Sequence, residues 1–320
     1  MKEWKVAHYS SADSVGGKAL TWWCREIEKR NPGKIKIHTF FSESLAKANE
    51  MLKTVSSGMA DAAYVALARY SKEFPFSNVC YIPFLPPYPV NQQVLTMNEL
   101  FKISPHIREE LERWHTAYGY TYCSPYYELM GNKPVRNIND FKDLTIKALP
   151  QAGKVFKKLG VRVYSSPILN TRSELEKNII DMINFSGPLG FYEWKFYECA
   201  KYYLKGAQIS GSRSMLLINL DSWSLLSERV RKSIETLRDE FAHILHDLYN
   251  DENKNEEALK RFRASGIEII HFPLDERKKL LAAAQGMEKE WVKETGGAAE
   301  EVLRNYLTIK NKIMINNRLI

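Results

Sequence analysis

The stretch Gly58-Met59-Ala60-Asp61-Ala62-Ala63-Tyr64-Val65-Ala66 decides the fold class of this chain. Its glycine is typical of the end of a helix, and the apolar run after Asp61 has the length of a buried strand. Two earlier strand-like runs, Trp4–His8 and Lys34–Phe40, are each followed by a helical pattern. Two β–α–β passes within about 65 residues predict a parallel sheet, because parallel strands need a crossover helix between them.

A second α/β pattern follows an extended aromatic segment, Tyr120–Tyr127, which we expect to leave the first domain. Ile146–Leu149 and Val161–Tyr164 are its predicted strands, and the extended run Met215–Asn219 is predicted to cross back. Helix formers then continue from residue 227 to about residue 265. They predict either one helix on the order of 55 Å long, which would run along both domains, or two helices with a break near residues 250–255.

This order of elements predicts two lobes joined by hinge strands. We assign residues 1–124 and 213–250 to lobe I, and residues 125–212 and 251–320 to lobe II, with the C-terminal helices packing across. Ligands of α/β proteins bind at the carboxyl ends of strands, which places the expected site in a cleft between the lobes. Closure of the hinge around a ligand is the expected motion.

Composition excludes several classes of protein. The 320 residues are 44% hydrophobic and 26% charged, as in a globular protein. The sequence contains no run of about 20 apolar residues, which is the length needed to span a bilayer. The net charge of +8 is dispersed, and its densest stretches, Arg229–Lys232 and Lys260–Arg263, fall on predicted helices that also carry acids. We therefore expect no nucleic-acid partner, since nucleic-acid binders concentrate their basic residues in a stripe.

Motifs for catalysis, metal binding and cofactors are missing from the sequence. It has no GxSxG, HExxH, P-loop or GxGxxG pattern, and its four cysteines form no CxxC. The histidine pair His243 and His246 shares a helix face, but no acid or cysteine completes a metal site. We expect a protein that is not an enzyme and holds no cofactor or metal, although an α/β enzyme stays as a weaker alternative.

Short fragments in a fixed order resemble one family, the DctP-type solute-binding proteins of tripartite ATP-independent periplasmic (TRAP) transporters. Ser57–Asp61 is similar to a family "sGavDm" pattern, and Asp140–Lys147 is similar to "eDlkGlKiR". The fragments that carry the resemblance extend over about 200 residues and are Gly33–Ile37, Ser44–Leu45, Glu50–Leu52, Ser57–Asp61, Ile82–Leu85, Lys133–Val135, Asp140–Lys147, Phe196–Glu198 and Lys201–Tyr202.

The resemblance implies an α/β, two-lobed fold like that of type II periplasmic binding proteins, with hinge strands and a long lobe-spanning helix. It also implies a periplasmic receptor that captures a small organic acid and delivers it to a TRAP membrane permease. The N-terminus runs directly into a predicted strand, so the sequence is either cytosolic or a mature form without its leader. The resemblance favours the mature periplasmic form.

The family binds its ligand carboxylate with an arginine, and the matching position here is Lys147. An ammonium is a point charge without the planar fork of a guanidinium, so Lys147 would orient a carboxylate less well. The alternative is that Lys147 faces solvent or pairs with a local acid. Arg213, just before the second crossing strand, is the other predicted anchor, ahead of Arg69 and Arg172.

The other positions that match the family site are mostly apolar or aromatic, which suits a monocarboxylate with an apolar, aromatic or branched body. A sugar acid or a dicarboxylate stays as the alternative, although a sugar acid would need more polar acceptors. Glu128 is the one nearby acid. Beyond Lys147 and Arg213, the predicted ligand-binding residues are Tyr9, Ser10, Ala66, Tyr127, Glu128, Asn184, Phe185 and Ser212.

Overall fold

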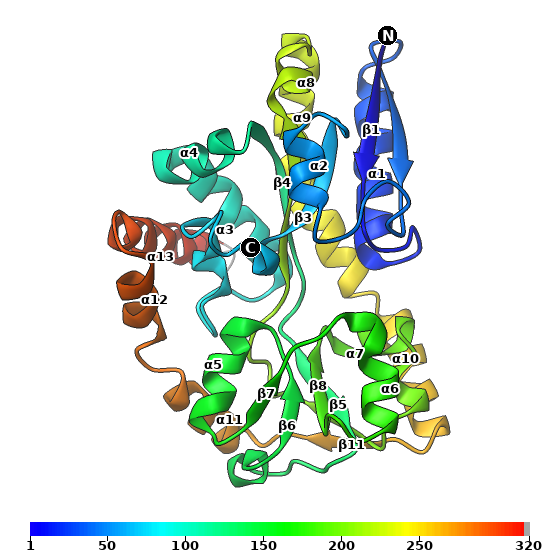
Figure 1. The fold of residues 1–320 in the computed structure, drawn as a ribbon, viewed down its shortest axis with the longest axis vertical. Helices are drawn as coiled ribbons and strands as arrows, with labels where there is room; N and C mark the ends of the chain where they lie inside the picture. Colours follow the sequence, from blue (N-terminus) through cyan, green and yellow to red (C-terminus); the bar gives the residue numbers. More distant parts are fainter. Residues whose placement is uncertain (317–320) are drawn as a thin grey trace.

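The computed structural model describes residues 1–316, and its strands form two sheets that are each covered by helices (Figure 1). In the first sheet, β1 pairs in parallel with β2 and β3, which confirms the predicted parallel arrangement. β10 runs antiparallel to its neighbours β3 and β4. The strands, in sheet order, are β2 (Ile35–Phe40), β1 (Lys2–Ala7), β3 (Ala62–Ala66), β10 (Arg213–Asn219) and β4 (Thr116–Cys123).

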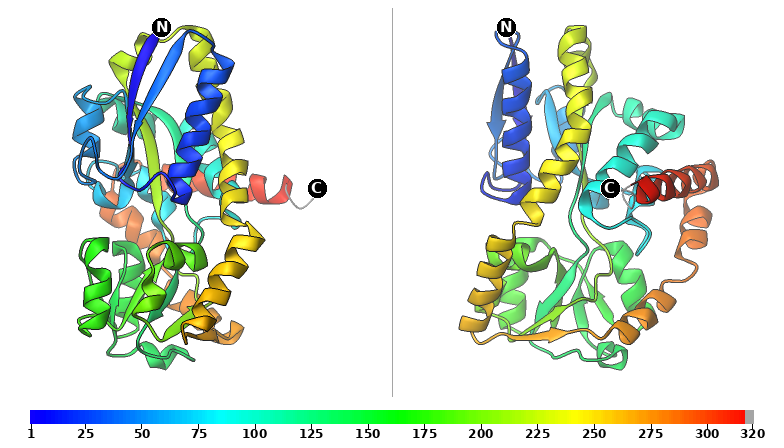
Figure 2. Two further views of the ribbon diagram at one scale, coloured as in Figure 1. Left: turned by 90° about the vertical axis from the view of Figure 1, so that its right-hand side faces the viewer. Right: turned by 180° about the vertical axis from the view of Figure 1, so that it is seen from behind.

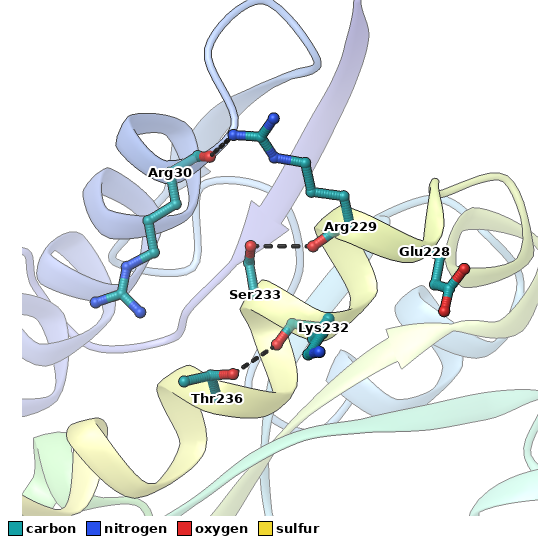
Figure 3. A pocket seen from close by; sticks show the side chains of 6 residues that line it. All are labelled: Arg30, Glu228, Arg229, Lys232, Ser233 and Thr236. Carbon is teal, nitrogen blue, oxygen red and sulfur yellow. Dashed lines mark hydrogen bonds between the residues drawn. The ribbon is translucent and has the colours of Figure 1, made fainter.

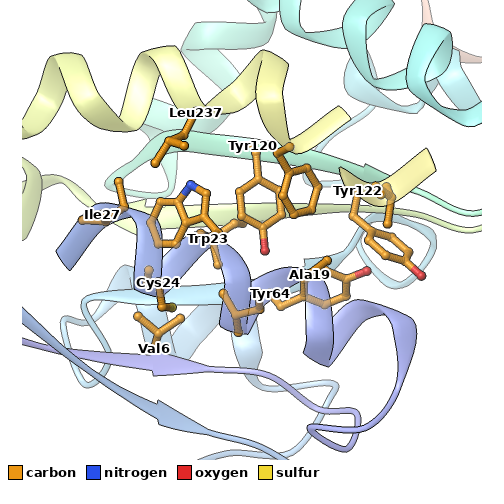
Figure 4. Close-up of a cluster of buried hydrophobic side chains, with 14 of the residues drawn as sticks. Val6, Ala19, Trp23, Cys24, Ile27, Tyr64, Tyr120, Tyr122 and Leu237 are labelled. Carbon is orange, nitrogen blue, oxygen red and sulfur yellow. The ribbon is translucent and has the colours of Figure 1, made fainter. Parts of the chain in front are cut away.

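Helix α1 shows how the sequence builds this lobe. The Ser14 hydroxyl accepts a hydrogen bond from the Gly17 backbone N–H at 3.1 Å and so caps the helix. Its buried side, with Trp23 and Ile27, packs against the sheet and against α9 (Figure 4). The helices of this first lobe are α1 (Val15–Arg30), α2 (Met51–Ser56), α3 (Val90–Ile103), α4 (Pro105–Arg113), α8 (Leu220–Ser224) and α9 (Glu228–Tyr249).

The second sheet is mixed, and its core has an apolar cluster on each face. Its strands, in sheet order, are β11 (Glu268–His271), β9 (Tyr202–Lys205), β5 (Glu128–Gly131), β8 (Met182–Phe185), β6 (Thr145–Lys147) and β7 (Arg162–Tyr164). The helices of this second lobe are α5 (Pro150–Lys158), α6 (Thr171–Glu176), α7 (Gly187–Glu193), α10 (Glu252–Ala264) and α11 (Leu274–Ala283).

Three segments connect the lobes in the middle of the molecule, and a fourth, residues 284–286 after α11, joins them at one side (Figures 1 and 2). Two are the extended links from β4 to β5 and from β9 to β10. The third is the turn between α9 and α10, where Asn250 ends one helix and the Asp251 side chain caps the next. The helical stretch predicted to span both lobes is therefore two helices, as the second of the sequence alternatives has it.

The C-terminal helices α12 (Met287–Thr295) and α13 (Ala299–Asn316) return to the first lobe. Met287, Trp291 and Tyr306 join the apolar cluster that contains residues of β3 and β10, and α13 packs on α3. These are therefore the two C-terminal helices that pack across from the second lobe onto the first. The other lobe boundaries stay a proposal, whereas α12 and α13, which the sequence assigned to lobe II, pack on the first lobe. Residues 317–320 of the predicted lobe II lie outside the described residues.

Within residues 1–316, no helix has both the length and the hydropathy needed to cross a bilayer.

Candidate ligand-binding site

The carboxyl end of β1 is the centre of the candidate site. β1 points toward the second lobe, and the chain then turns into α1, so this strand end and the first turn of α1 both face that lobe (Figure 1). β3 lies beside β1 and is parallel to it, which brings Tyr64 and Ala66 to the same edge. The strand ends therefore meet where ligands of α/β proteins bind.

Five ring side chains gather at this edge, and we call them the ring cluster: His8, Tyr9, Tyr64, Tyr122 and Tyr249. The His8 and Tyr64 ring centroids are 4.1 Å apart, and Tyr64 lies 5.3 Å from both Tyr9 and Tyr122. The hydroxyls of Tyr122 and Tyr249 share a hydrogen bond. Burial raises the pKa of all four tyrosines, so their hydroxyls stay protonated.

The second lobe packs directly against this region. Leu189 of α7 is 7% exposed and belongs to the same apolar cluster as Tyr122 and Tyr249. Phe185, at the end of β8, lies 5.6 Å from the Tyr127 ring on the first crossing link. The lobes are therefore in contact in this structure, and the Tyr127 and Phe185 rings meet where they join.

His8 has an unusual environment within the ring cluster. It is 1% exposed, and its Nδ1 accepts a hydrogen bond from the Ser10 backbone N–H at 3.0 Å. Nε2 therefore carries the ring proton, and this buried donor has no partner. Burial lowers the pKa of His8 to about 3, so the imidazole is neutral.

Lys147 is held inside the second lobe. Its ammonium donates to the Pro167 carbonyl at 2.8 Å, to the Thr171 hydroxyl at 2.7 Å and to the Glu174 carboxylate at 3.1 Å. An ammonium has three donors, and all three are used here. Lys147 thus pairs with a local acid, which was the alternative role considered for it from the sequence. Its role as carboxylate anchor stays a prediction that the geometry does not support.

Arg213 ties the two crossing links together. Its Nη1 donates to the Ser212 carbonyl at 2.7 Å and to the Ser124 carbonyl at 3.3 Å, and its Nε is buried without a partner. Arg213 is 1% exposed and lies on the same side of β10 as Met215. Met215 belongs to one apolar cluster, whereas Tyr64 and Tyr122 belong to another, so Arg213 faces away from the ring cluster. Ser214 points to the opposite side, toward Tyr9 and Tyr64. The geometry supports a role for Arg213 at the hinge.

The remaining predicted residues divide into two groups. Ser10, Ala66, Ser212 and Tyr127 lie at strand ends and links around the ring cluster, since Ala66 pairs with Ser214 and Ser212 lies one residue before Arg213. The Glu128 carboxylate is instead bound by the Tyr203 hydroxyl and the Gly206 backbone N–H.

Asn184 is buried in β8, where its amide nitrogen donates to the Glu128 carbonyl and its oxygen has no partner. Arg172 pairs with Glu198 at 2.6 Å, while Arg69 is exposed near Tyr9.

Sequence reasoning missed His8, Tyr64, Tyr122 and Tyr249. His8 immediately precedes the predicted Tyr9, and a histidine at a strand end just before a Ser-capped helix is a signal that was available. Tyr64 and Tyr122 are inside strands, where alternation directs them to the site side. Tyr249 is at the end of a helix more than 120 residues from Tyr122, and only the fold brings the two together.

A separate depression of about 470 Å³ lies on the first lobe, between α1 and α9 (Figure 3). It has no aromatic wall, and the Arg30 guanidinium beside it is already paired with Glu240 at 2.6 Å. The Arg229 side chain donates to the Arg30 carbonyl and so closes the end of α1. This depression is lined by Arg30, Glu228, Arg229, Lys232, Ser233 and Thr236.

The fold places the candidate site of this two-lobed protein at strand ends, and the comparisons put it among solute-binding receptors rather than enzymes. The sequence profile of the family described as "DctP: Bacterial extracellular solute-binding protein, family 7" matches residues 6–295. The chain therefore belongs to this solute-binding family.

Solved structures share the fold over nearly the whole chain. A TRAP solute-binding protein from Rhodoferax ferrireducens, in complex with copurified benzoate, has a TM-score of 0.87 at 15% identity and covers 99% of this chain and 100% of its own. A TRAP periplasmic solute-binding protein from Desulfovibrio salexigens, in an open complex, has a TM-score of 0.83 at 22% identity, with 97% and 96% coverage.

A curated relative is a monocarboxylate 2-oxoacid-binding periplasmic protein from Nostoc sp. It is 24% identical over 191 residues, which are 58% of this chain and 51% of the relative. This chain thus aligns with about half the length of the relative.

Proposed function

We propose that this protein is an extracytoplasmic receptor that binds a small monocarboxylic acid with an apolar, aromatic or branched body between its lobes and delivers it to a TRAP permease. The observation that carries the proposal is the ring cluster at the strand ends. Neutral rings and hydroxyls surround the candidate site, and the nearby Glu128 carboxylate is already bound within its own lobe. Such walls enclose an apolar body and hydrogen-bond a polar end.

The family and the relatives support the same reading. The family is described as extracellular and solute-binding. The Rhodoferax structure holds benzoate, and a marine metagenome TRAP protein is described as specific for aromatic acids. The Nostoc relative is named for monocarboxylate 2-oxoacids. All of these ligands are small acids, which is the ligand class that the ring cluster suits.

A panel of acids tests the ligand class. Purified protein is heated with benzoate, 3-hydroxybenzoate, pyroglutamate, pyruvate, a branched 2-oxo acid, succinate, glucuronate and sialic acid, and each hit is confirmed by calorimetry. We expect monocarboxylates to raise the melting temperature, since a ligand that binds only the folded state stabilises it. Stabilisation by glucuronate, sialic acid or succinate, with none by the monocarboxylates, would contradict the proposal.

A further inference from the structure

Because Lys147 is bound inside the second lobe, the carboxylate of the ligand needs another partner. A ligand carboxylate moved out of water needs donors that replace its hydration. The ammonium of Lys147 has no donor left, and Arg213 is turned to the side of β10 away from the ring cluster. The carboxylate donor must then come from other residues near the ring cluster.

The first turn of α1 faces the ring cluster with free backbone donors. In an α-helix the first four N–H groups have no carbonyl one turn before them, and together they carry partial positive charge. The Ser14 hydroxyl accepts a hydrogen bond from the Gly17 N–H, and the Glu193 carboxylate of the second lobe accepts one from the Val15 N–H. The N–H of Gly16 is left, in a 16-residue helix that already attracts one carboxylate in this structure.

His8 adds a second, independent donor at the same place. Its Nε2–H is buried, has no partner, and lies 3.1 Å from the position that a Cβ on Gly16 would take. The Tyr122 ring is the next-nearest side chain, at 3.7 Å from that position. Because residue 16 has no side chain, a small space remains between the imidazole and the helix end.

We propose that the carboxylate of the bound acid is held at the first turn of α1 by the Nε2–H of His8 and the backbone N–H of Gly16, in place of a cationic anchor. This rests on the proposed function and specifies its site. Two neutral donors and a helix end suffice for an anion, since carboxylates are stabilised at helix N-termini. The apolar body then extends between Tyr9, Tyr64 and Tyr122.

Calorimetry with the tightest-binding acid of the panel tests this assignment. We expect His8→Phe, which keeps a ring against Tyr64 but removes the donor, to weaken binding at least tenfold. Gly16→Ala, which places a methyl group against Nε2, should do the same. His8→Gln, which retains an N–H donor, should restore part of the affinity. The matched control His38→Phe alters an exposed histidine on β2 and should change the dissociation constant less than twofold.

Discrimination between the acid and its primary amide separates recognition from packing. The wild type should prefer the acid, and this preference should shrink in His8→Phe. An NMR titration of the wild-type protein needs no substitution: the ¹⁵N resonance of His8 Nε2 should shift when the acid is added.

The outcomes are distinct. If none of the monocarboxylates binds the wild type, the proposed function fails. If an acid binds but His8→Phe keeps full affinity and the wild-type Nε2 resonance stays in place, the assignment to His8 is wrong; loss of affinity in a folded double variant, Lys147→Met with Glu174→Gln, would return the anchor to Lys147.

Discussion

Lys147 forms a buried ion pair with Glu174 inside the second lobe. Burial lowers its pKa, and Glu174 opposes this by favouring the charged form. Both side chains are nearly inaccessible, at 8% and 5% exposure. A pair buried this deeply is costly to break, because the remaining charge stays out of water without a partner.

Replacing Lys147 by Met should therefore reduce the free energy of unfolding by about 3–5 kcal/mol. Urea unfolding followed by circular dichroism measures this loss. The double variant Lys147→Met with Glu174→Gln removes both charges and should recover most of it, and its affinity for the acid should remain within about threefold of wild type. A double variant that folds but no longer binds would show that Lys147 contacts ligand.

The limits of sequence reasoning are clear at these residues. The sequence predicted a strand at Ile146–Leu149, whereas β6 runs from Thr145 to Lys147 and so ends at Lys147. Its partner Glu174 is 27 positions further along, in helix α6, and no local pattern connects the two. His8 was overlooked for the opposite reason: its role depends on the tautomer that the Ser10 backbone imposes, which only coordinates reveal.

At the scale of elements, the sequence predicted more. Apolar strands alternating with amphipathic helices were enough to predict the parallel pairing of β1 with β2 and β3, because buried strands have a simple pattern. The break between α9 and α10 stayed ambiguous, since Asn and Asp are tolerated inside helices as well as at caps. The return of α12 and α13 to the first lobe depends on long-range packing that periodicity does not encode.

The link between β9 and β10 leads to a prediction about the hinge. Arg213 joins the Ser124 and Ser212 carbonyls, and the Ser212 backbone N–H also donates to the Ser124 hydroxyl at 2.8 Å. Arg213→Lys loses the planar fork, so the two links should separate more often. Hydrogen exchange at the amides of Ser124 and Ser212 should then become at least tenfold faster.

Arg238→Lys is the control for this experiment. Arg238 is also a buried arginine that donates to backbone carbonyls, those of Tyr118 and Gly119, but it lies away from the links. It should leave the exchange of the Ser124 and Ser212 amides unchanged. Equal acceleration in both variants would mean that Arg213 has no special part in the hinge.

Helix α4 is joined to the loop before α3 by a buried acid, Glu110. Its carboxyl accepts from the Ser77 backbone N–H at 3.0 Å and from the Ser77 hydroxyl at 2.7 Å, and it is 0% exposed. Burial raises the pKa of Glu110 to about 7, although these hydrogen bonds oppose the shift. The folded state therefore binds a proton between about pH 4.5 and 7 that the unfolded state does not.

Stability should accordingly fall as the pH rises from 5 to 8, by roughly 1–3 kcal/mol, given 1.36 kcal/mol for each unit of pKa shift. Chemical unfolding at each pH measures this slope. Glu110→Gln cannot titrate and should flatten the slope, even if it lowers stability at every pH. Glu193, whose pKa burial raises to about 6, contributes with the same sign, so a residual slope is expected.

For the whole molecule, ligand affinity should depend on contacts that form only when the lobes meet. Leu189 of α7 is buried in the apolar cluster of the opposite lobe, which includes Tyr122 and Tyr249, and it would be exposed in an opened molecule. Burying a leucine side chain contributes about 1.5–3 kcal/mol, and each 1.4 kcal/mol corresponds to a tenfold change in affinity. Leu189→Ala should thus weaken binding of the acid roughly tenfold while leaving the fold of each lobe intact.

Leu225→Ala is the matched control, since Leu225 is 62% exposed and follows α8 on the first lobe. It should bind the acid like the wild type. Small-angle scattering completes the test: if Leu189 stabilises the closed state, the ligand-free Leu189→Ala protein should have a larger radius of gyration than wild type, and saturating acid should reduce the difference. Unchanged affinity together with unchanged scattering would mean that lobe closure does not use the α7 contact, and the coupling between binding and closure would need another interface.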